Sequence, residues 1–122
     1  MFGNIDKNFV KSVKVSELAN KHGKFFQLDD ETEVAIFKVY DKVYVVDNVC
    51  PHNHSPLMHE GYIDEVQNEK YVVCPVHGFQ FHLETGEQPH KMGCKLRTFE
   101  HKIENDFIYI KKPKKKIFNF KF

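Results

Sequence analysis

The sequence predicts an all-β fold, and three features of the chain support this class. Short runs of β-branched and aromatic residues recur along its 122 residues. Turn signals rich in Asp, Asn and Gly separate these runs, and several runs alternate apolar with polar residues. Short strands at such spacing are typical of an antiparallel sandwich or barrel. No repeat of the solenoid type is visible in the sequence.

The first half of the chain predicts a hairpin that leads directly to Cys50. Its two strands are the apolar runs at residues 33–40 and 43–47, and Asp41–Lys42 separates them. Upstream of this hairpin we expect a short strand, a helical turn with Ser16 as its N-cap, a second strand and a turn, at residues 13–15, 16–22, 24–28 and 29–31.

Five further strands are expected after the first cysteine. They are the alternating or β-branched runs at residues 62–63, 71–73, 79–83, 95–103 and 107–110. The polar segment 64–70 is interpreted as a turn, as are residues 84–86 and 104–106. Within 95–103, the alternation predicts that Leu96, Phe99 and Ile103 are core residues.

Length and composition predict one soluble domain over residues 1–122. Hydrophobic residues make up 41% and charged residues 29% of the chain, as in ordinary globular proteins. No apolar run reaches the roughly 18 residues of a membrane span, and the N-terminus lacks the apolar region of a secretory signal. Three cysteines make a disulfide scaffold improbable, so a reducing cytoplasm is the expected compartment.

Two cysteine–histidine pairs are the strongest chemical feature of the sequence. Cys50 and His52 are separated by one residue, and Cys74 and His77 by two; a proline follows each cysteine. Two sulfur and two nitrogen donors suit zinc or an iron–sulfur cluster. Because each loop mixes one cysteine with one histidine, and no C-x-x-C knuckle is present, the pattern favours a two-iron centre with two histidines on one iron. A structural zinc site remains the alternative.

These loops resemble those of the Rieske 2Fe-2S family. Cys50, His52, Cys74 and His77 match the family's four ligand positions, which implies a Rieske-type 2Fe-2S cluster. The resemblance extends to Pro56–Leu57, Gly61–Tyr62, Gly78–Phe79, Phe81 and Thr85–Gly86. It implies three antiparallel sheets, with a cluster-binding subdomain at about 47–86 inserted into a base domain. The base domain would comprise residues 12–46 and 87–111, and a basic, aromatic tail would follow at 112–122.

The resemblance also implies a cluster of low reduction potential. High-potential Rieske proteins carry a disulfide between the two loops, at positions that match Ser55 and Val76. They also carry hydroxyl donors to the cluster, at positions that match Phe79 and Phe81. Ser55 and Val76 cannot form the disulfide, and Phe79 and Phe81 carry no hydroxyl group, so we expect a low-potential centre.

Charge is distributed unevenly along a chain whose net charge is only +1. Residues 47–87 contain seven acidic side chains and one lysine, whereas 112–122 contain five lysines and no acid. An acidic cluster end would suit a basic face on a redox partner, although a plain solvated surface explains it equally well. The basic tail alone does not predict nucleic-acid binding, and no membrane partner is expected.

The predicted function is that of a Rieske-type ferredoxin, a one-electron carrier between a reductase and a terminal oxygenase or reductase. Its partners would be a flavoprotein reductase and the terminal enzyme. The chain is not expected to be an enzyme itself, because it carries no second iron site or catalytic triad. The alternatives are the Rieske small subunit of a nitrite reductase-like complex and, from another class, a zinc-stabilised interaction module.

Overall fold

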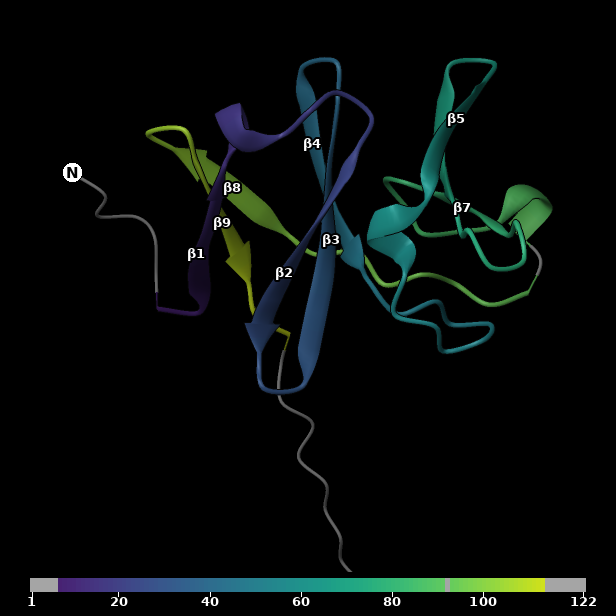
Figure 1. Ribbon diagram of the computed structural model, residues 1–122, viewed down its shortest axis with the longest axis horizontal. Coiled ribbons are helices and arrows are strands. Elements are labelled where there is room, and N and C mark those ends of the chain that lie inside the picture. Colours follow the sequence, from purple (N-terminus) through teal and green to yellow (C-terminus); the bar gives the residue numbers. More distant parts are fainter. Residues whose placement is uncertain (1–6, 92, 114–122) are drawn as a thin grey trace, which may run out of the picture.

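Three antiparallel sheets of three strands each make up almost the whole fold (Figure 1). The computed structural model describes residues 7–91 and 93–113. The sheet β1-β9-β8 consists of Phe9–Lys14, Phe107–Lys111 and His101–Glu104. The sheet β2-β3-β4 consists of Gly23–Asp29, Thr32–Val39 and Lys42–Asp47. The sheet β5-β6-β7 consists of Tyr62–Val66, Glu69–Val73 and Gln80–His82. The predicted all-β class with three antiparallel sheets is therefore confirmed.

The helical structure of the described residues is limited to short 3₁₀ segments. They are η1, η2 and η3, at Val15–Glu17, Met58–Glu60 and Pro89–Lys91. Within residues 7–91 and 93–113, no helix has the length and apolar character that crossing a membrane requires.

The sheet β2-β3-β4 lies between the other two and is buried on both faces (Figure 1). Since side chains alternate along a strand, β3 supplies Val34 and Ile36 to one hydrophobic cluster and Ala35 and Phe37 to the other. The first cluster includes Ile108 of the sheet β1-β9-β8, and the second extends toward β5-β6-β7. This double burial explains why β3 and β4 are nearly continuous apolar runs in the sequence.

Three hairpins, β3–β4, β5–β6 and β8–β9, close with short turns that contain left-handed residues. The β3–β4 turn places Tyr40 at φ 58°, and its amide donates to Asn20 Oδ1 at 2.6 Å. In the β8–β9 turn Asn105 and Asp106 have φ of 54° and 71°, the geometry of a type I′ turn. Asn and Asp tolerate this conformation better than most residues, which is why this hairpin could be predicted from its sequence.

The polar segment 64–70 is mostly strand, which corrects its interpretation as a turn. β5 runs to Val66, β6 starts at Glu69, and only Gln67 and Asn68 form the turn, both with positive φ. The strands carry exposed polar residues here because this end of the hairpin extends beyond the core. Backbone pairing, not burial or polarity, distinguishes these strands from their turn.

Two other local predictions are wrong. Residues 16–22 do not form a helical turn capped by Ser16; η1 begins at Val15, and the Ser16 hydroxyl instead donates to Asp106 at 2.6 Å. The strand expected at 95–103 begins only at His101, and Ile103 is 48% exposed rather than part of the core. Leu96 and Phe99 are buried as predicted.

Candidate metal centre

The two cysteine–histidine loops adopt the same turn, although their spacing differs. In the first, the Cys50 amide donates to the Ser55 carbonyl at 2.9 Å, and the His54 amide donates to the Cys50 carbonyl at 2.8 Å. In the second, the Cys74 amide donates to Phe79 and the Gly78 amide to Cys74, each at 2.9 Å. The fourth residue after each cysteine is left-handed, with φ of 60° at His54 and 75° at Gly78. Two matching turns therefore present the four predicted ligands.

The sulfur and nitrogen donors differ in their exposure to solvent. Both cysteines are fully buried, and they belong to the same hydrophobic cluster. His52 and His77 are exposed; their ring centroids lie 5.9 Å apart at an interplanar angle of 76°. The site thus has a sulfur pair inside and an imidazole pair at the surface.

Burial raises the pKa of the Cys50 thiol above its ordinary value of 9.0. The adjacent Cys74 thiol also raises this pKa, whereas the main-chain amides of His52 and Asn53 donate toward the Cys50 sulfur and lower it. The metal-free thiol is therefore protonated at neutral pH, and a metal must displace its proton to bind. The two amides are already placed to stabilise the thiolate that results.

The donor arrangement fits a two-iron cluster. Among the described residues, no three His, Cys, Asp or Glu side chains converge on one ion position. In a Rieske centre each iron needs only two protein ligands, since bridging sulfides complete the coordination. A further observation fits the same group: Asn53 Nδ2, in the first ligand loop, is buried without a hydrogen-bond partner in the protein.

Phe79 covers the imidazole of His52. Their ring centroids are 4.1 Å apart, and the His77 ring lies 6.4 Å from Phe79. Phe81 is fully buried in the cluster that also contains the two cysteines. Both phenylalanines border the site, and neither offers a hydrogen-bond donor there.

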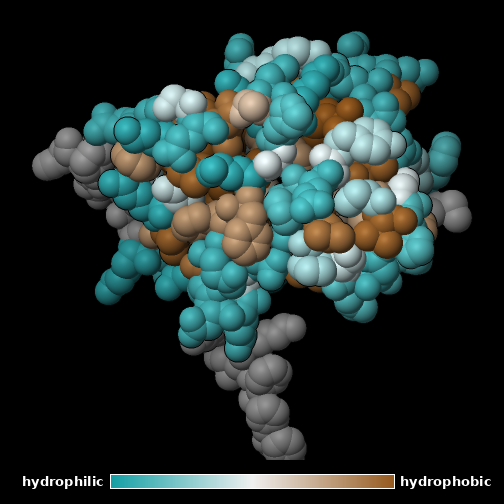
Figure 2. All heavy atoms as spheres, viewed as in Figure 1, coloured by the Kyte–Doolittle hydropathy of each residue, from teal (hydrophilic) through white to brown (hydrophobic). Residues whose placement is uncertain are grey.

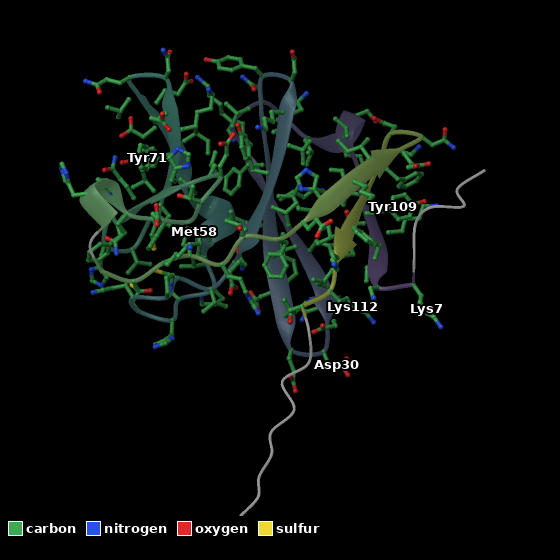
Figure 3. All side chains as sticks on the ribbon, turned by 180° about the vertical axis from the view of Figure 1, so that it is seen from behind. Lys7, Asp30, Met58, Tyr71, Tyr109 and Lys112 are labelled. Atoms are coloured by element: carbon green, nitrogen blue, oxygen red, sulfur yellow. The ribbon has the colours of Figure 1, made fainter. Side chains whose placement is uncertain are left out.

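Asn48 anchors the first loop, and the sequence analysis missed it. The side chain is fully buried; Nδ2 donates to Glu33 Oε1 at 2.8 Å and to the Pro56 carbonyl at 2.9 Å. Its Oδ1 accepts the His59 amide at 2.7 Å and lies 2.9 Å from His59 Nδ1. No sequence signal singles it out, because the adjacent Asp47 is equally polar and also lies between the apolar strand and the ligand loop. Met58, next to these bonds in η2, is buried among the core residues (Figure 3).

Several acidic side chains of residues 47–87 form ion pairs with the rest of the chain. Glu65 pairs with Lys21 at 2.6 Å, and Glu84 pairs with Lys42 at 2.7 Å. Asp47 pairs with Arg97 at 3.2 Å. These contacts tie the segment that carries the ligands to the neighbouring sheets and neutralise part of the acidity that the sequence displays.

Comparisons with known proteins point to one family. Residues 8–111 match the family model of the Rieske-like [2Fe-2S] domain. The chain is 36% identical over 89 residues to a nitrite reductase [NAD(P)H] of Emericella nidulans, covering 68% of this chain and 8% of that protein. It is 29% identical over 96 residues to the 3-phenylpropionate/cinnamic acid dioxygenase ferredoxin subunit of Escherichia coli K12, covering 75% and 83%.

Solved structures share the fold at low identity. The nitrite reductase [NAD(P)H] small subunit of Erwinia carotovora has a TM-score of 0.74 at 16% identity, covering 95% of this chain and 90% of that one. The ferredoxin of carbazole 1,9a-dioxygenase from Nocardioides aromaticivorans has a TM-score of 0.73 at 21% identity, covering 86% and 98%. The chain spans only 8% of the length of the nitrite reductases that it matches. Because the family model extends over most of the sequence, this chain belongs to the Rieske-like [2Fe-2S] family.

Proposed function

We propose that this chain is a Rieske-type ferredoxin that carries one electron at a time between a reductase and a terminal enzyme. In this proposal Cys50 and Cys74 hold one iron of a 2Fe-2S cluster, and His52 and His77 hold the other. The observation that carries it is the sorting of donors in two matching turns, with sulfurs buried and imidazoles exposed.

The chain's own residues have three tasks in this function. The bound cluster supplies a one-electron couple. The amides of His52 and Asn53 stabilise negative charge at the Cys50 sulfur, and the surrounding core excludes water from both cysteines. The two exposed imidazoles provide the edge at which a partner can approach.

Iron, sulfide and spectroscopy distinguish this function from zinc binding. The purified protein should be brown, contain two irons and two acid-labile sulfides per chain, and give an EPR signal after reduction with dithionite. A colourless protein with one zinc and no sulfide would reject the ferredoxin. Separation of the donors into a buried and an exposed pair supports the two-iron assignment.

We also infer a low reduction potential, near the roughly −150 mV lower end of the Rieske range. Phe79 and Phe81 border the site without offering donors, and Ser55 and Val76 cannot form a disulfide between the loops. A redox titration followed by the visible absorption of the cluster measures this directly. A midpoint well above zero would contradict the inference.

The redox partners distinguish two versions of the proposal. Similarity to a dioxygenase ferredoxin subunit supports a free carrier between a flavoprotein reductase and an oxygenase. Similarity to nitrite reductases supports a bound small subunit instead. Affinity purification of the tagged protein from its native cells distinguishes the two, because a stable complex with a large reductase subunit favours the bound form. A protein that purifies as a monomer, and that a reductase then reduces in a turnover assay, favours the free carrier.

A further inference from the structure

The side-chain amide of Asn53 has one satisfied and one unsatisfied end. Asn53 Oδ1 accepts the main-chain amide of Ser55 at 3.0 Å. Because an N–H group needs an oxygen acceptor here, this bond fixes which way the amide is turned. The other end, Nδ2, is therefore a true donor, and it is buried without a partner.

An unsatisfied buried donor is rare and calls for an explanation. Among the described residues, Asn53 Nδ2 is the one buried side-chain nitrogen or oxygen in this condition. By contrast, all the polar atoms of the equally polar Asn48 side chain in the same region are paired. Leaving a donor in this state costs the free energy of removing it from water, so a partner in the functional protein is expected.

The position of Asn53 indicates the chemistry of that partner. It follows the candidate ligand His52 directly and lies inside the turn that the His54 amide closes onto the Cys50 carbonyl, so it belongs to the ligand loop itself. The Cys50 sulfur itself is present and is not within hydrogen-bonding range of Nδ2. The acceptors that a 2Fe-2S cluster adds to this site are its bridging sulfides.

We propose that Asn53 Nδ2 donates a hydrogen bond to a bridging sulfide of the cluster and so raises its reduction potential. This inference rests on the proposed function. Reduction adds one negative charge to the cluster, and a donor aimed at sulfide stabilises the reduced form more than the oxidised form. Asn53 then supplies, from the first loop, a donor of the kind that Phe79 and Phe81 do not offer.

Two substitutions test the amide. Asn53→Ala removes the Nδ2 donor together with the acceptor of the Ser55 amide. Asn53→Asp keeps the shape and the acceptor, removes the donor and adds a negative charge. His54→Asn is the matched control, since it changes an exposed residue of the same loop whose left-handed backbone suits asparagine.

We expect Asn53→Ala to shift the reduction equilibrium about tenfold toward the oxidised form, which corresponds to about 59 mV for one electron. Asn53→Asp should lower the potential further, and His54→Asn should leave it unchanged. An unchanged potential in both Asn53→Ala and Asn53→Asp, with the cluster intact, would overturn the inference.

A second measurement uses the wild-type protein, so it does not depend on cluster assembly in a variant. In the reduced protein, with the asparagine side chains labelled with ¹⁵N, pulsed EPR should detect a nitrogen weakly coupled to the cluster. Absence of this coupling overturns the role of Asn53 while leaving the ferredoxin function intact. A wild-type protein without any cluster signal would instead reject the proposed function itself.

Discussion

Cys50 and Cys74 are distinguished from the third cysteine by burial. Both candidate ligands are fully enclosed, whereas Cys94 is only partly buried and lies near Gln88. A buried thiol resists ionisation, so these two sulfurs become good ligands only when a metal compensates the loss of the proton. The same burial then protects the thiolates from solvent.

The three cysteines permit a matched test of the ligand assignment. Cys74→Ser should abolish the visible absorption of the cluster and reduce bound iron to background, because one iron loses a thiolate that a hydroxyl does not replace well. Cys94→Ser should retain full iron content and spectrum. Iron and sulfide analysis of both purified variants checks this; loss of the cluster in Cys94→Ser would point to a different ligand set.

His101 makes stability depend on pH. Burial lowers its pKa below the ordinary 6.5, and hydrogen bonds to the main chain at Phe99 and Val43 offset only part of this effect. Below about pH 6.5 the unfolded chain binds a proton at this histidine that the folded chain does not, so stability falls as pH decreases.

We therefore expect the melting temperature to fall as the pH is lowered from 7 through about 6.5 toward the lower pKa of the folded protein. His101→Gln, which cannot be protonated, should reduce this slope. Thermal melts of both proteins between pH 8 and pH 5, followed by circular dichroism, measure the difference. Equal slopes would mean that His101 is not neutral in the folded protein.

The four candidate ligands stand out in the sequence because their chemistry and short spacing are local. Asn48 and Asn53 do not. Their importance depends on burial and on partners such as Glu33, which becomes adjacent only when β3 pairs with β4. An asparagine in a polar loop carries no sequence signal that it will be buried.

At the scale of elements, the turn that follows β7 requires glycine for two reasons. Gly86 has φ of 78°, and a β-carbon at this position would collide with the Leu96 carbonyl. Gly78 has a similar φ of 75°, but a β-carbon there would meet nothing within 4 Å. Substitution of Gly78 would therefore cause backbone strain alone, whereas substitution of Gly86 would cause both backbone strain and a steric clash.

Alanine substitutions at these glycines should have unequal effects. Gly78→Ala should cost about 1–2 kcal/mol, the strain of a left-handed non-glycine residue. Gly86→Ala should cost about 3 kcal/mol or more, because a main-chain carbonyl must also move. Urea unfolding of the two variants beside wild type gives both values; equal losses would show that the Gly86 turn has room to relax.

Strands were predicted correctly where the apolar pattern of the sequence matches the burial of the strand, and incorrectly where the two differ. β3, β4 and β9 are apolar runs with clear turn residues, so their sequence was sufficient. The strands β5 and β6 extend into polar residues 64–70 because pairing with each other, not burial, holds them there. Residues 95–100 alternate like a strand, yet they pass the middle sheet with only the Val46–Thr98 bridge.

At the scale of the whole molecule, the metal centre lies at one end and the sheet β1-β9-β8 at the other. Tyr71 and Tyr109 mark these two ends in Figure 3. Hydrophilic side chains cover most of the face shown in Figure 2. An ion pair links β5 to the turn before β2: the Lys21 ammonium bonds to Glu65, which raises the pKa of Lys21 to about 12 and lowers that of Glu65. The acidity of residues 47–87 therefore serves partly to join sheets.

The acids that remain free of such pairs determine how charged redox reagents approach the cluster. Glu60 follows the first ligand loop in η2, its side chain is 61% exposed, and its ion-pair contact is with His59 at 3.8 Å. If the cluster end is electronegative, oxidation of the reduced protein by hexaammineruthenium(III), a cation, should slow as salt is added. Oxidation by hexacyanoferrate(III), an anion, should accelerate, since screening removes attraction in the first case and repulsion in the second.

Glu60→Gln should weaken both salt dependences, whereas Glu104→Gln, on β8 of the far sheet, should change neither. Stopped-flow oxidation of the three proteins by each reagent at several ionic strengths measures the six salt dependences. Identical salt dependence for the cation and the anion would show that the local charge at the cluster end is neutral. In that case the ion pairs that join the sheets would account for the acidity of residues 47–87, and a partner would recognise the exposed His52 and His77 by shape rather than by charge.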